Sequence, residues 1–180
     1  MSQSVKLRVV IDTNVWINVF VHKFLKSPKQ PYTEIASALT AGEFVPVYCE
    51  ECFDELVYML TDSELAKHYG IDPVKGGEFV GIVLAKGGEQ VEITGNVFLS
   101  SDPDDDAFAE TALVGQVDIL VSDDKDLHEV AVTTELGKSD IRVLWSSQFR
   151  AVLKRRRMEP EKAAEHTQNT TPIAEAAPNM

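Results

Sequence analysis

The sequence has 180 residues, of which 44% are hydrophobic, and it carries a formal net charge of −12. This length allows one well-packed domain with a tail. The charge excludes a broad polyanion-binding surface, because affinity for nucleic acid comes largely from Lys and Arg side chains that neutralise phosphates. No apolar run approaches the roughly 18–20 residues of a membrane span, and MSQSVKLRVV lacks the apolar stretch of a signal peptide. We therefore expect a soluble, cytoplasmic protein without membrane contact.

Strands and helices are predicted to alternate along most of the chain. Short apolar runs predict buried strands, in chain order at residues 6–12, 44–48, 90–94, 118–122 and 141–145. Helical periodicity with Gly or Pro at the ends predicts helices, at residues 14–26, 32–42, 49–60, two within 62–88 around Asp72-Pro73, 105–115, 124–131 and 146–157. This alternation favours an α/β fold, with a parallel sheet covered by helices on both faces.

Residues 1–157 are expected to form one domain, and residues 158–180 a disordered tail. From Glu159 onward large apolar side chains are almost absent, and Ala, Thr, Asn, Pro and Glu dominate. Such a segment cannot bury enough apolar surface to offset the entropy lost on ordering it.

Two cysteines, Cys49 and Cys52, form a single CEEC motif. A redox pair or half of a zinc site is one interpretation, but no second CxxC and no paired histidines complete a set of four ligands. We favour buried free thiols, the common state of cysteine in a protein interior.

Two basic patches are candidates for local contact with nucleic acid. The first contains Lys23, Lys26 and Lys29, and the second is the run Lys154, Arg155, Arg156 and Arg157. Lys23, Lys26, Arg155 and Arg156 are the residues we select as candidate nucleic-acid-binding residues. The alternative, which the sequence leaves open, is that these charges only stabilise helix C-termini.

Acidic residues gather where the predicted strands and helices meet. The stretch SSDPDDDAFAETA, residues 100–112, places four Asp within five positions ahead of a helix. One or two would suffice for helix capping. In open parallel sheets, sites form beyond the carboxyl ends of the strands, where Asp12 and Asp124 follow predicted strands. The helices that carry Asp105 and Glu55 can reach the same edge.

Such a cluster of carboxylates needs a cation. Two like charges about 4 Å apart repel by about 4 kcal/mol at an effective dielectric near 20. Carboxylate oxygens suit Mg²⁺ or Mn²⁺, which keep several waters and bridge to phosphate groups. A metal held in this way can activate water for hydrolysis of a phosphodiester.

The blocks VVIDTNVWIN, CFDELVYML, DPDDDAFAETALVGQVDILVS and DDKDL together resemble the PIN-domain family, in particular its toxin group from toxin–antitoxin pairs. The resemblance covers residues 5–150, and the order and spacing of the four blocks are more specific than any one block. It implies a three-layer α/β/α fold with a mainly parallel central sheet, and a metal-dependent ribonuclease activity.

The resemblance also assigns the catalytic and metal-binding carboxylates, which are Asp12, Glu55, Asp105 and Asp124. Neighbouring acids compete for three of these roles: Glu51 with Glu55, Asp102 and Asp106 with Asp105, and Asp126 with Asp124. Asn14 and Ser122 occupy the supporting polar positions.

The implied partners are an RNA substrate, a cognate antitoxin protein and a second copy of the chain in a homodimer. The alternative function is a non-catalytic module that binds RNA or protein through the same fold.

Trp16, at helical spacing from Phe20, is expected in the core. His128 is expected on a helix surface, in preference to a role in proton transfer.

Overall fold

The computed structural model describes residues 6–25 and 29–158 of the chain. Its strands are β1 Leu7–Ile11, β2 Phe44–Tyr48, β3 Glu89–Gln90, β4 Ile119–Val121 and β5 Arg142–Leu144. They form one parallel sheet in the order β3-β2-β1-β4-β5. The tail is predicted over residues 158–180. Met158 is the last residue of helix Ser146–Met158, and residues 159–180 lie outside the described residues.

Helices connect the strands and cover the sheet. The longer ones are α1 Thr13–Phe20, α2 Tyr32–Ala41, α3 Glu50–Thr61, α4 Glu64–Tyr69, α5 Pro73–Ala85, α6 Asp106–Val114, α7 Val130–Gly137 and α8 Ser146–Met158. Shorter turns are the π-helical η1 Val21–Leu25 and the 3₁₀ turns η2 Pro103–Asp105 and η3 Asp126–His128. Within the described ranges, no helix is long and apolar enough to cross a membrane.

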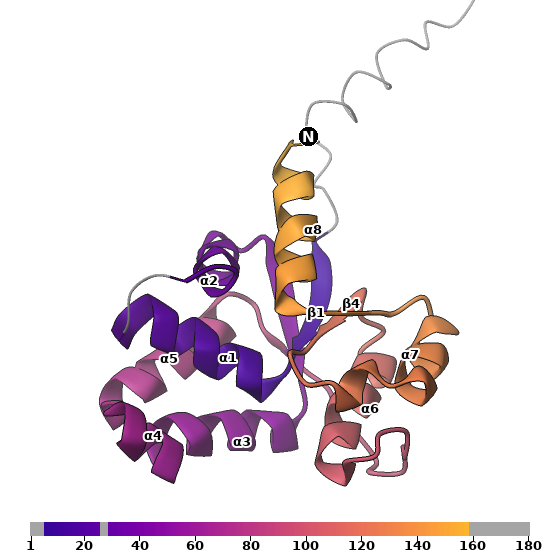
Figure 1. Cartoon of the computed structure of the whole chain (residues 1–180), viewed down its shortest axis with the longest axis horizontal. Helices are drawn as coiled ribbons and strands as arrows, with labels where there is room; N and C mark the ends of the chain where they lie inside the picture. Colours follow the sequence, from indigo (N-terminus) through magenta and orange to yellow (C-terminus); the bar gives the residue numbers. More distant parts are fainter. Residues whose placement is uncertain (1–5, 26–28, 159–180) are drawn as a thin grey trace, which may run out of the picture.

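The sheet lies between two layers of helices, because successive side chains of a strand point to opposite faces. Val9 and Ile11 of β1 join a core cluster with side chains from α1, α2, α3, α5 and α8. Val10 joins a second cluster with Phe108 of α6 and Leu136 of α7. Figure 1 shows α6 and α7 on one side of β1 and β4, and α1, α3, α4 and α5 on the other. The predicted three-layer α/β/α fold with a parallel sheet is confirmed.

The strand predicted over residues 90–94 is wrong in its extent, since β3 contains only Glu89 and Gln90. The last backbone bond beside β2 runs from Val91 N to Tyr48 O (2.9 Å). Beyond it, the backbone N–H groups of Thr94 and Gly95 donate to a side chain of α6, the Glu110 carboxylate, at 2.7 and 2.9 Å. A bond to a side chain distant in sequence therefore replaces the sheet ladder, and the alternation of residues 90–94 gives no sign of this.

The helix predicted over residues 124–131 is also wrong. The structure has the 3₁₀ turn η3, an extended Glu129 (φ −59°, ψ 151°) and then α7 as a separate helix. The β-branched residues of VAVTTELG have low helix propensity, which is why the sequence did not indicate α7. Burial of Val132 and Leu136 against the sheet stabilises it.

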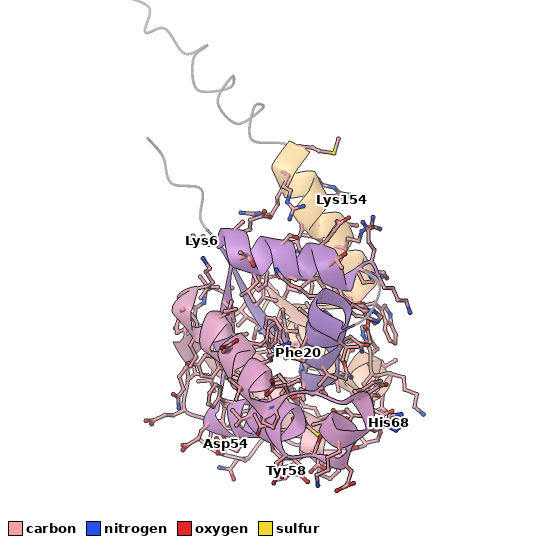
Figure 2. The ribbon with its side chains drawn as sticks, turned by 90° about the vertical axis from the view of Figure 1, so that its left-hand side faces the viewer. Lys6, Phe20, Asp54, Tyr58, His68 and Lys154 are labelled. Atoms are coloured by element: carbon pink, nitrogen blue, oxygen red, sulfur yellow. The ribbon has the colours of Figure 1, made fainter. Side chains whose placement is uncertain are left out.

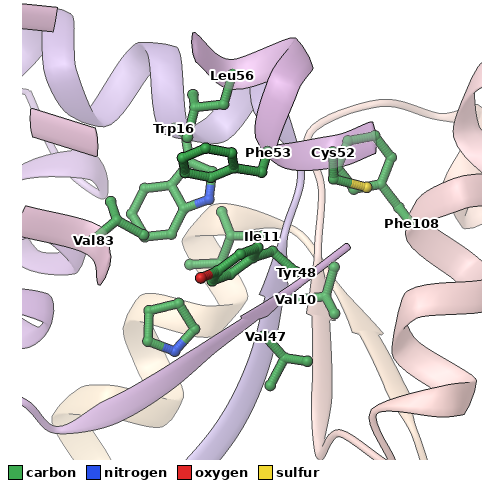
Figure 3. A pocket seen from close by; sticks show the side chains of 11 residues that line it. Val10, Ile11, Trp16, Val47, Tyr48, Cys52, Phe53, Leu56, Val83 and Phe108 are labelled. Atoms are coloured by element: carbon green, nitrogen blue, oxygen red, sulfur yellow. The ribbon is translucent and has the colours of Figure 1, made fainter. Parts of the chain in front are cut away.

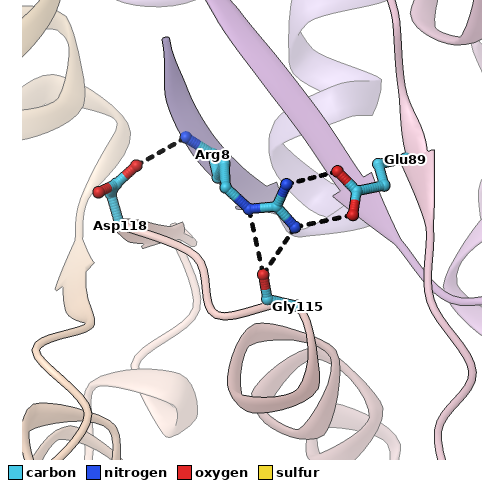
Figure 4. A network of polar contacts seen from close by, with 4 residues as sticks. All are labelled: Arg8, Glu89, Gly115 and Asp118. Carbon is cyan, nitrogen blue, oxygen red and sulfur yellow. Dashed lines mark hydrogen bonds and ion pairs between the residues drawn. The ribbon is translucent and has the colours of Figure 1, made fainter. Parts of the chain in front are cut away.

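At the opposite end of the strands from the predicted site, Arg8 of β1 connects β3, the end of α6 and the segment before β4 (Figure 4). Its guanidinium binds both carboxylate oxygens of Glu89 on β3 and donates to the Gly115 carbonyl (2.8 Å). The Arg8 backbone N–H donates to the Asp118 carboxylate (2.7 Å). This paired geometry holds the edge strand β3 against the centre of the sheet.

We expect Arg8→Met to destabilise the protein by about 1–2 kcal/mol, because it removes a bidentate, partly buried pair and leaves the Gly115 carbonyl without this donor. Urea unfolding measures the change. Lys67→Met, which removes the solvent-exposed pair with Glu64 on α4, is the control and should cause no measurable change. Equal effects of both variants would contradict a special role for Arg8.

Candidate active site

Asp12 directly follows β1, at the carboxyl edge of the sheet. Its backbone N–H donates to Val121 O on the neighbouring strand (2.9 Å), which places it beside the end of β4. Its side chain caps α1, because Oδ1 accepts from the backbone N–H of Asn14 (3.3 Å). Oδ2 accepts a short hydrogen bond from the Ser122 hydroxyl. With only 4% of its surface exposed, Asp12 is a buried carboxylate in a fixed orientation.

The segment after β4 is ordered by a chain of short-range bonds. Ser122, fully buried, donates to Asp12 and accepts from the Asp124 backbone N–H (2.9 Å). The Asp124 side chain accepts in turn from the Asp126 N–H (3.0 Å). Asp124 therefore uses Oδ1 to cap the turn, and its second carboxylate oxygen, Oδ2, remains for the carboxylate cluster.

The acidic stretch before α6 divides into structural and site-facing residues. Asp106 is buried, and its Oδ1 accepts from the N–H groups of Leu99 and Ser100, both at 2.8 Å. This bonding shows Asp106 holding the preceding loop, so the structure does not favour it as an alternative to Asp105. The Asp105 side chain makes no capping bond. Asp105, Asp102 and Asp126 each offer a carboxylate oxygen, and these three oxygens lie within 4.8 Å of one another.

Glu55 lies on the exposed side of α3 and is positioned by α1. Its Oε2 accepts a hydrogen bond from the Thr13 hydroxyl (2.8 Å), and Thr13 is the residue next to Asp12. Its alternative, Glu51, lies one turn earlier and interacts with the Cys49 thiol. Sequence reasoning did not select Thr13, although its place between Asp12 and Asn14 was the available signal.

Burial and mutual repulsion raise the pKa values of two of these carboxyl groups. Burial is the main cause that raises the pKa of Asp12 to about 6, and the charges of Glu55 and Asp124 add to it, against hydrogen bonds from Ser122 and Asn14. Burial also raises the pKa of Asp105 to about 7, followed by the charges of Asp12 and Asp124 and, more weakly, of Asp102 and Asp126. The predicted carboxylates are therefore close enough to repel one another.

This donor set fits a hard divalent cation. Carboxylate oxygens, the ligand type that Mg²⁺ and Mn²⁺ prefer, are offered by Asp12, Glu55, Asp102, Asp105, Asp124 and Asp126. Burial is the main cause of the raised pKa of Asp105, and a bound cation would offset the repulsion from Asp12 and Asp124 that adds to it. Asp12, Asp105 and Asp124 could hold it, with Asp102, Asp126 and Glu55 beside them.

The CEEC motif has a structural role at the start of α3. Cys49 is the N-cap residue, and its Sγ accepts from the Cys52 N–H (3.3 Å). Both cysteines are buried and free, and their sulfur atoms lie 3.1 Å apart. The hydrogen bond between the two sulfur atoms lowers the pKa of the Cys49 thiol to about 7 and raises that of Cys52.

An apolar cavity of about 20 Å³ lies next to the cysteines. Figure 3 shows Trp16, Tyr48 and Phe53 on one side of this space, and Cys52 and Phe108 on another. It has room for about one water molecule, and none of the described residues in its wall has a carboxylate or basic side chain, so it is not a candidate for the cation. Trp16 is 5% exposed, as expected for a core residue.

The prediction that His128 lies on a helix surface is wrong. Its ring is half-buried, stacks on Trp145 with 3.7 Å between ring centres, and places Nε2 2.9 Å from Ser122 O. The prediction was wrong because η3 turns the ring toward the end of β4. His128 thereby supports the backbone of Ser122.

The basic residues lie at the other edge of the sheet. Lys23 reaches Thr40 near the end of α2 (3.4 Å), and Arg155 and Arg156 precede Arg157, which pairs with Glu43 just before β2. Figure 2 shows Lys154 at the same end of the molecule as Lys6, with Asp54 and His68 at the other end. Lys26 lies outside the described residues. A role for these residues in binding nucleic acid stays a prediction, and it requires an RNA that extends across the molecule.

The fold and this edge together define an α/β protein with an acidic, cation-compatible site. A family model described as PIN domain matches residues 8–126, from β1 to Asp126 at the start of η3. The match covers more than half of the chain, and the chain belongs to the PIN-domain family. PIN domains are generally nucleases, and the acidic group of Asp102, Asp105 and Asp126 is compatible with their use of divalent metals. No curated protein matches the chain.

Proposed function

We propose that the protein is a Mg²⁺- or Mn²⁺-dependent endoribonuclease that hydrolyses RNA phosphodiester bonds. The observation that supports this most strongly is the convergence of Asp12, Asp105 and Asp124 on one sheet edge. These acids come from three separate segments. Burial is the main cause that raises the pKa values of Asp12 and Asp105, and the charge of Asp124 adds to both shifts. Mutually repelling carboxylates of this kind are the donor set of metal-dependent phosphoryl-transfer sites.

When bound, the divalent cation supplies a lowered pKa for water and neutralises the charge that develops on the phosphate. The chain's own residues prepare the site for it. Ser122 and the Asn14 N–H fix the two oxygens of Asp12. Thr13 holds Glu55, whose exposed carboxylate is free to orient a water or accept its proton. Asp105, whose pKa is raised by burial and nearby charges, would hold the cation as a carboxylate.

Family membership and the four sequence blocks support further parts of the proposal. The protein would act in the cytoplasm as the toxin of a toxin–antitoxin pair, as a homodimer, and a cognate antitoxin would inhibit it. Expression of the chain alone and together with a candidate antitoxin, followed by measurement of growth and of the assembled mass, tests these parts separately from the chemistry.

The test of the activity is cleavage of a pool of structured and single-stranded RNA by the full chain. The reaction is run with Mg²⁺, with Mn²⁺ and with chelator, beside DNA of the same sequence. We expect cleavage of RNA that requires metal. Stoichiometric RNA binding without cleavage, from a folded protein, would instead favour a non-catalytic binding module.

We expect Ser122→Ala to lower kcat by roughly 10- to 100-fold, the usual cost of losing a residue that orients a metal ligand. It removes the donor to Asp12 and the acceptor for the Asp124 N–H. Ser37→Ala, on the exposed surface of α2, is the matched control and should leave kcat unchanged. A kcat within twofold of wild type for Ser122→Ala would show that this hydroxyl does not orient Asp12.

A further inference from the structure

A cavity of about 180 Å³ opens between α1 and α4, next to the carboxylates. Its wall combines amide, apolar and ring side chains, among them Asn14, Asn18, Ile17, Leu65, His22 and Tyr69. Among the residues that the structure describes, no Lys, Arg, Asp or Glu side chain lines it. The cavity therefore suits an uncharged, planar group more than a phosphate or a metal ion.

The position of the cavity follows from the start of α1. The Asn14 N–H donates to Asp12 Oδ1, so Asn14 belongs to both the carboxylate edge and the cavity. Asn18 and His22 follow at spacings of one helical turn and lie on the same face. With a rise of about 1.5 Å per residue, the cavity extends roughly 12 Å along α1 and the start of η1, from Asn14 to His22. A nucleotide held there would be next to a phosphate at the carboxylates.

The side chains of the cavity match the chemistry of a nucleobase. Tyr69 is 38% exposed, and the His22 ring is stacked on Tyr32 (ring centres 5.3 Å apart, planes within 6°). Unpaired bases stack on such rings and form hydrogen bonds through their edges.

The two amides supply these edge contacts. The Asn18 amide donates to Asn14 O (2.9 Å), which orients it at the cavity. Among the described residues, the buried Asn14 Oδ1 has no hydrogen-bond partner. A buried acceptor without a donor is costly, so a small turn of the Asn14 side chain toward the cavity would let the amino or imino group of a base supply the donor.

We propose that this cavity binds one unpaired nucleobase of the RNA, on a nucleotide adjacent to the scissile phosphate. The inference rests on the ribonuclease activity proposed above and adds to it a preference for single-stranded RNA with a defined base at one position. An unpaired base is required, because a base stacked within a helix cannot enter a cavity of this kind.

The test uses short single-stranded oligoribonucleotides that differ only at the nucleotides beside the cleaved bond, with each of the four bases or an abasic sugar there. We expect one of these positions to show a base preference. An abasic sugar there should lower kcat/KM by about 10-fold or more, the size typical of a lost base–aromatic stack.

Tyr69→Ala and Asn18→Ala are the informative variants. Each should lower kcat/KM on the preferred base by a similar factor, yet change it little on the abasic substrate, because the lost contact is the same. Tyr58→Ala is the matched control, since Tyr58 is an exposed tyrosine (55%) on α3 that does not line the cavity. Tyr69→Ala and Asn18→Ala losses that are equal on all substrates would overturn the proposal.

A binding experiment separates this proposal from the activity itself. Free adenosine, guanosine, cytidine and uridine are titrated into the full chain carrying Asp12→Asn, and NMR shifts of the Asn18, Leu65 and Tyr69 amides are followed. Shifts without any RNA cleavage by the wild type would support the base site and refute the nuclease. Cleavage that is indifferent to the flanking bases, with no shifts at these amides, would refute the base site alone.

Discussion

Replacing Asp12 with Asn is expected to abolish RNA cleavage and, at the same time, to stabilise the metal-free protein. Asp12 is 4% exposed, and burial raises its pKa from 3.8 to about 6. At pH 8 the folded protein therefore contains a buried charge that the unfolded chain would solvate. One pKa unit corresponds to about 1.4 kcal/mol. We therefore expect the free energy of unfolding to rise by about 2 kcal/mol, once the loss of one ideal hydrogen bond from Ser122 or Asn14 has been subtracted. Urea unfolding in chelator measures it.

The catalytic loss should be roughly 100- to 1,000-fold or more, since removal of a transition-state-stabilising charge typically has this size. Asp104→Asn is the matched control: the same charge change, in the same acidic region, at an exposed residue outside the cluster. It should leave both activity and stability nearly unchanged. An Asp12→Asn variant that is less stable than wild type in chelator would show that the charge of Asp12 does not strain the fold.

The second large effect concerns pH. The pKa values of Asp12 and Asp105 are raised above 3.8, to about 6 and about 7, so in the absence of metal the folded state binds more protons than the unfolded state. The stability from these two groups is fully present below about pH 4 and is lost as the pH rises through 6 and 7. A divalent cation must displace the same protons. The apparent affinity for Mg²⁺ should therefore rise on the order of 10-fold between pH 6 and pH 8.

Calorimetric titration of the full chain with Mg²⁺ at several pH values measures this rise. Thermal unfolding should agree, with a stabilisation by Mg²⁺ that is small at pH 6 and large at pH 8. The Asp105→Asn variant binds Mg²⁺ more weakly, and its affinity should show a much shallower dependence on pH between 6 and 8. An affinity of the wild type that is constant over this range would exclude Asp105 from the metal site.

The sequence alone predicted the sheet and the residues at its edge better than the role of each acid. Asp12 was identifiable because it directly follows a strongly apolar strand, whose end fixes its position. In contrast, Asp102, Asp105 and Asp106 differ by only one to four positions, and a helical turn directs each to another side. Which residue faces the site depends on the loop before α6, where Leu99 and Ser100 donate to Asp106. Such tertiary bonds have no local signature.

The interactions that position the carboxylates could likewise not be predicted from the sequence. Ser122 was selected from the resemblance, but its short bond to Asp12 joins residues 110 positions apart. Thr13 and the ring of His128 were missed or misplaced because their partners, Glu55 and Trp145, come from other elements. The strand prediction after residue 90 was wrong for the same reason, since hydrogen bonds to the Glu110 carboxylate replace the sheet ladder there. Assignment of the metal ligands among these acids stays a prediction.

The loop between β3 and α6 is attached to α6 at two points, through Glu110 at Thr94 and Gly95, and through Asp106 at Leu99 and Ser100. Phe98, between these attachments, is 77% exposed. The loop tip can therefore be altered or lengthened while its anchored ends keep Asp105 in place. A fluorescent dye attached through Phe98→Cys would report on RNA arriving beside the carboxylates, and the buried thiols of Cys49 and Cys52 would leave this new thiol as the accessible labelling site.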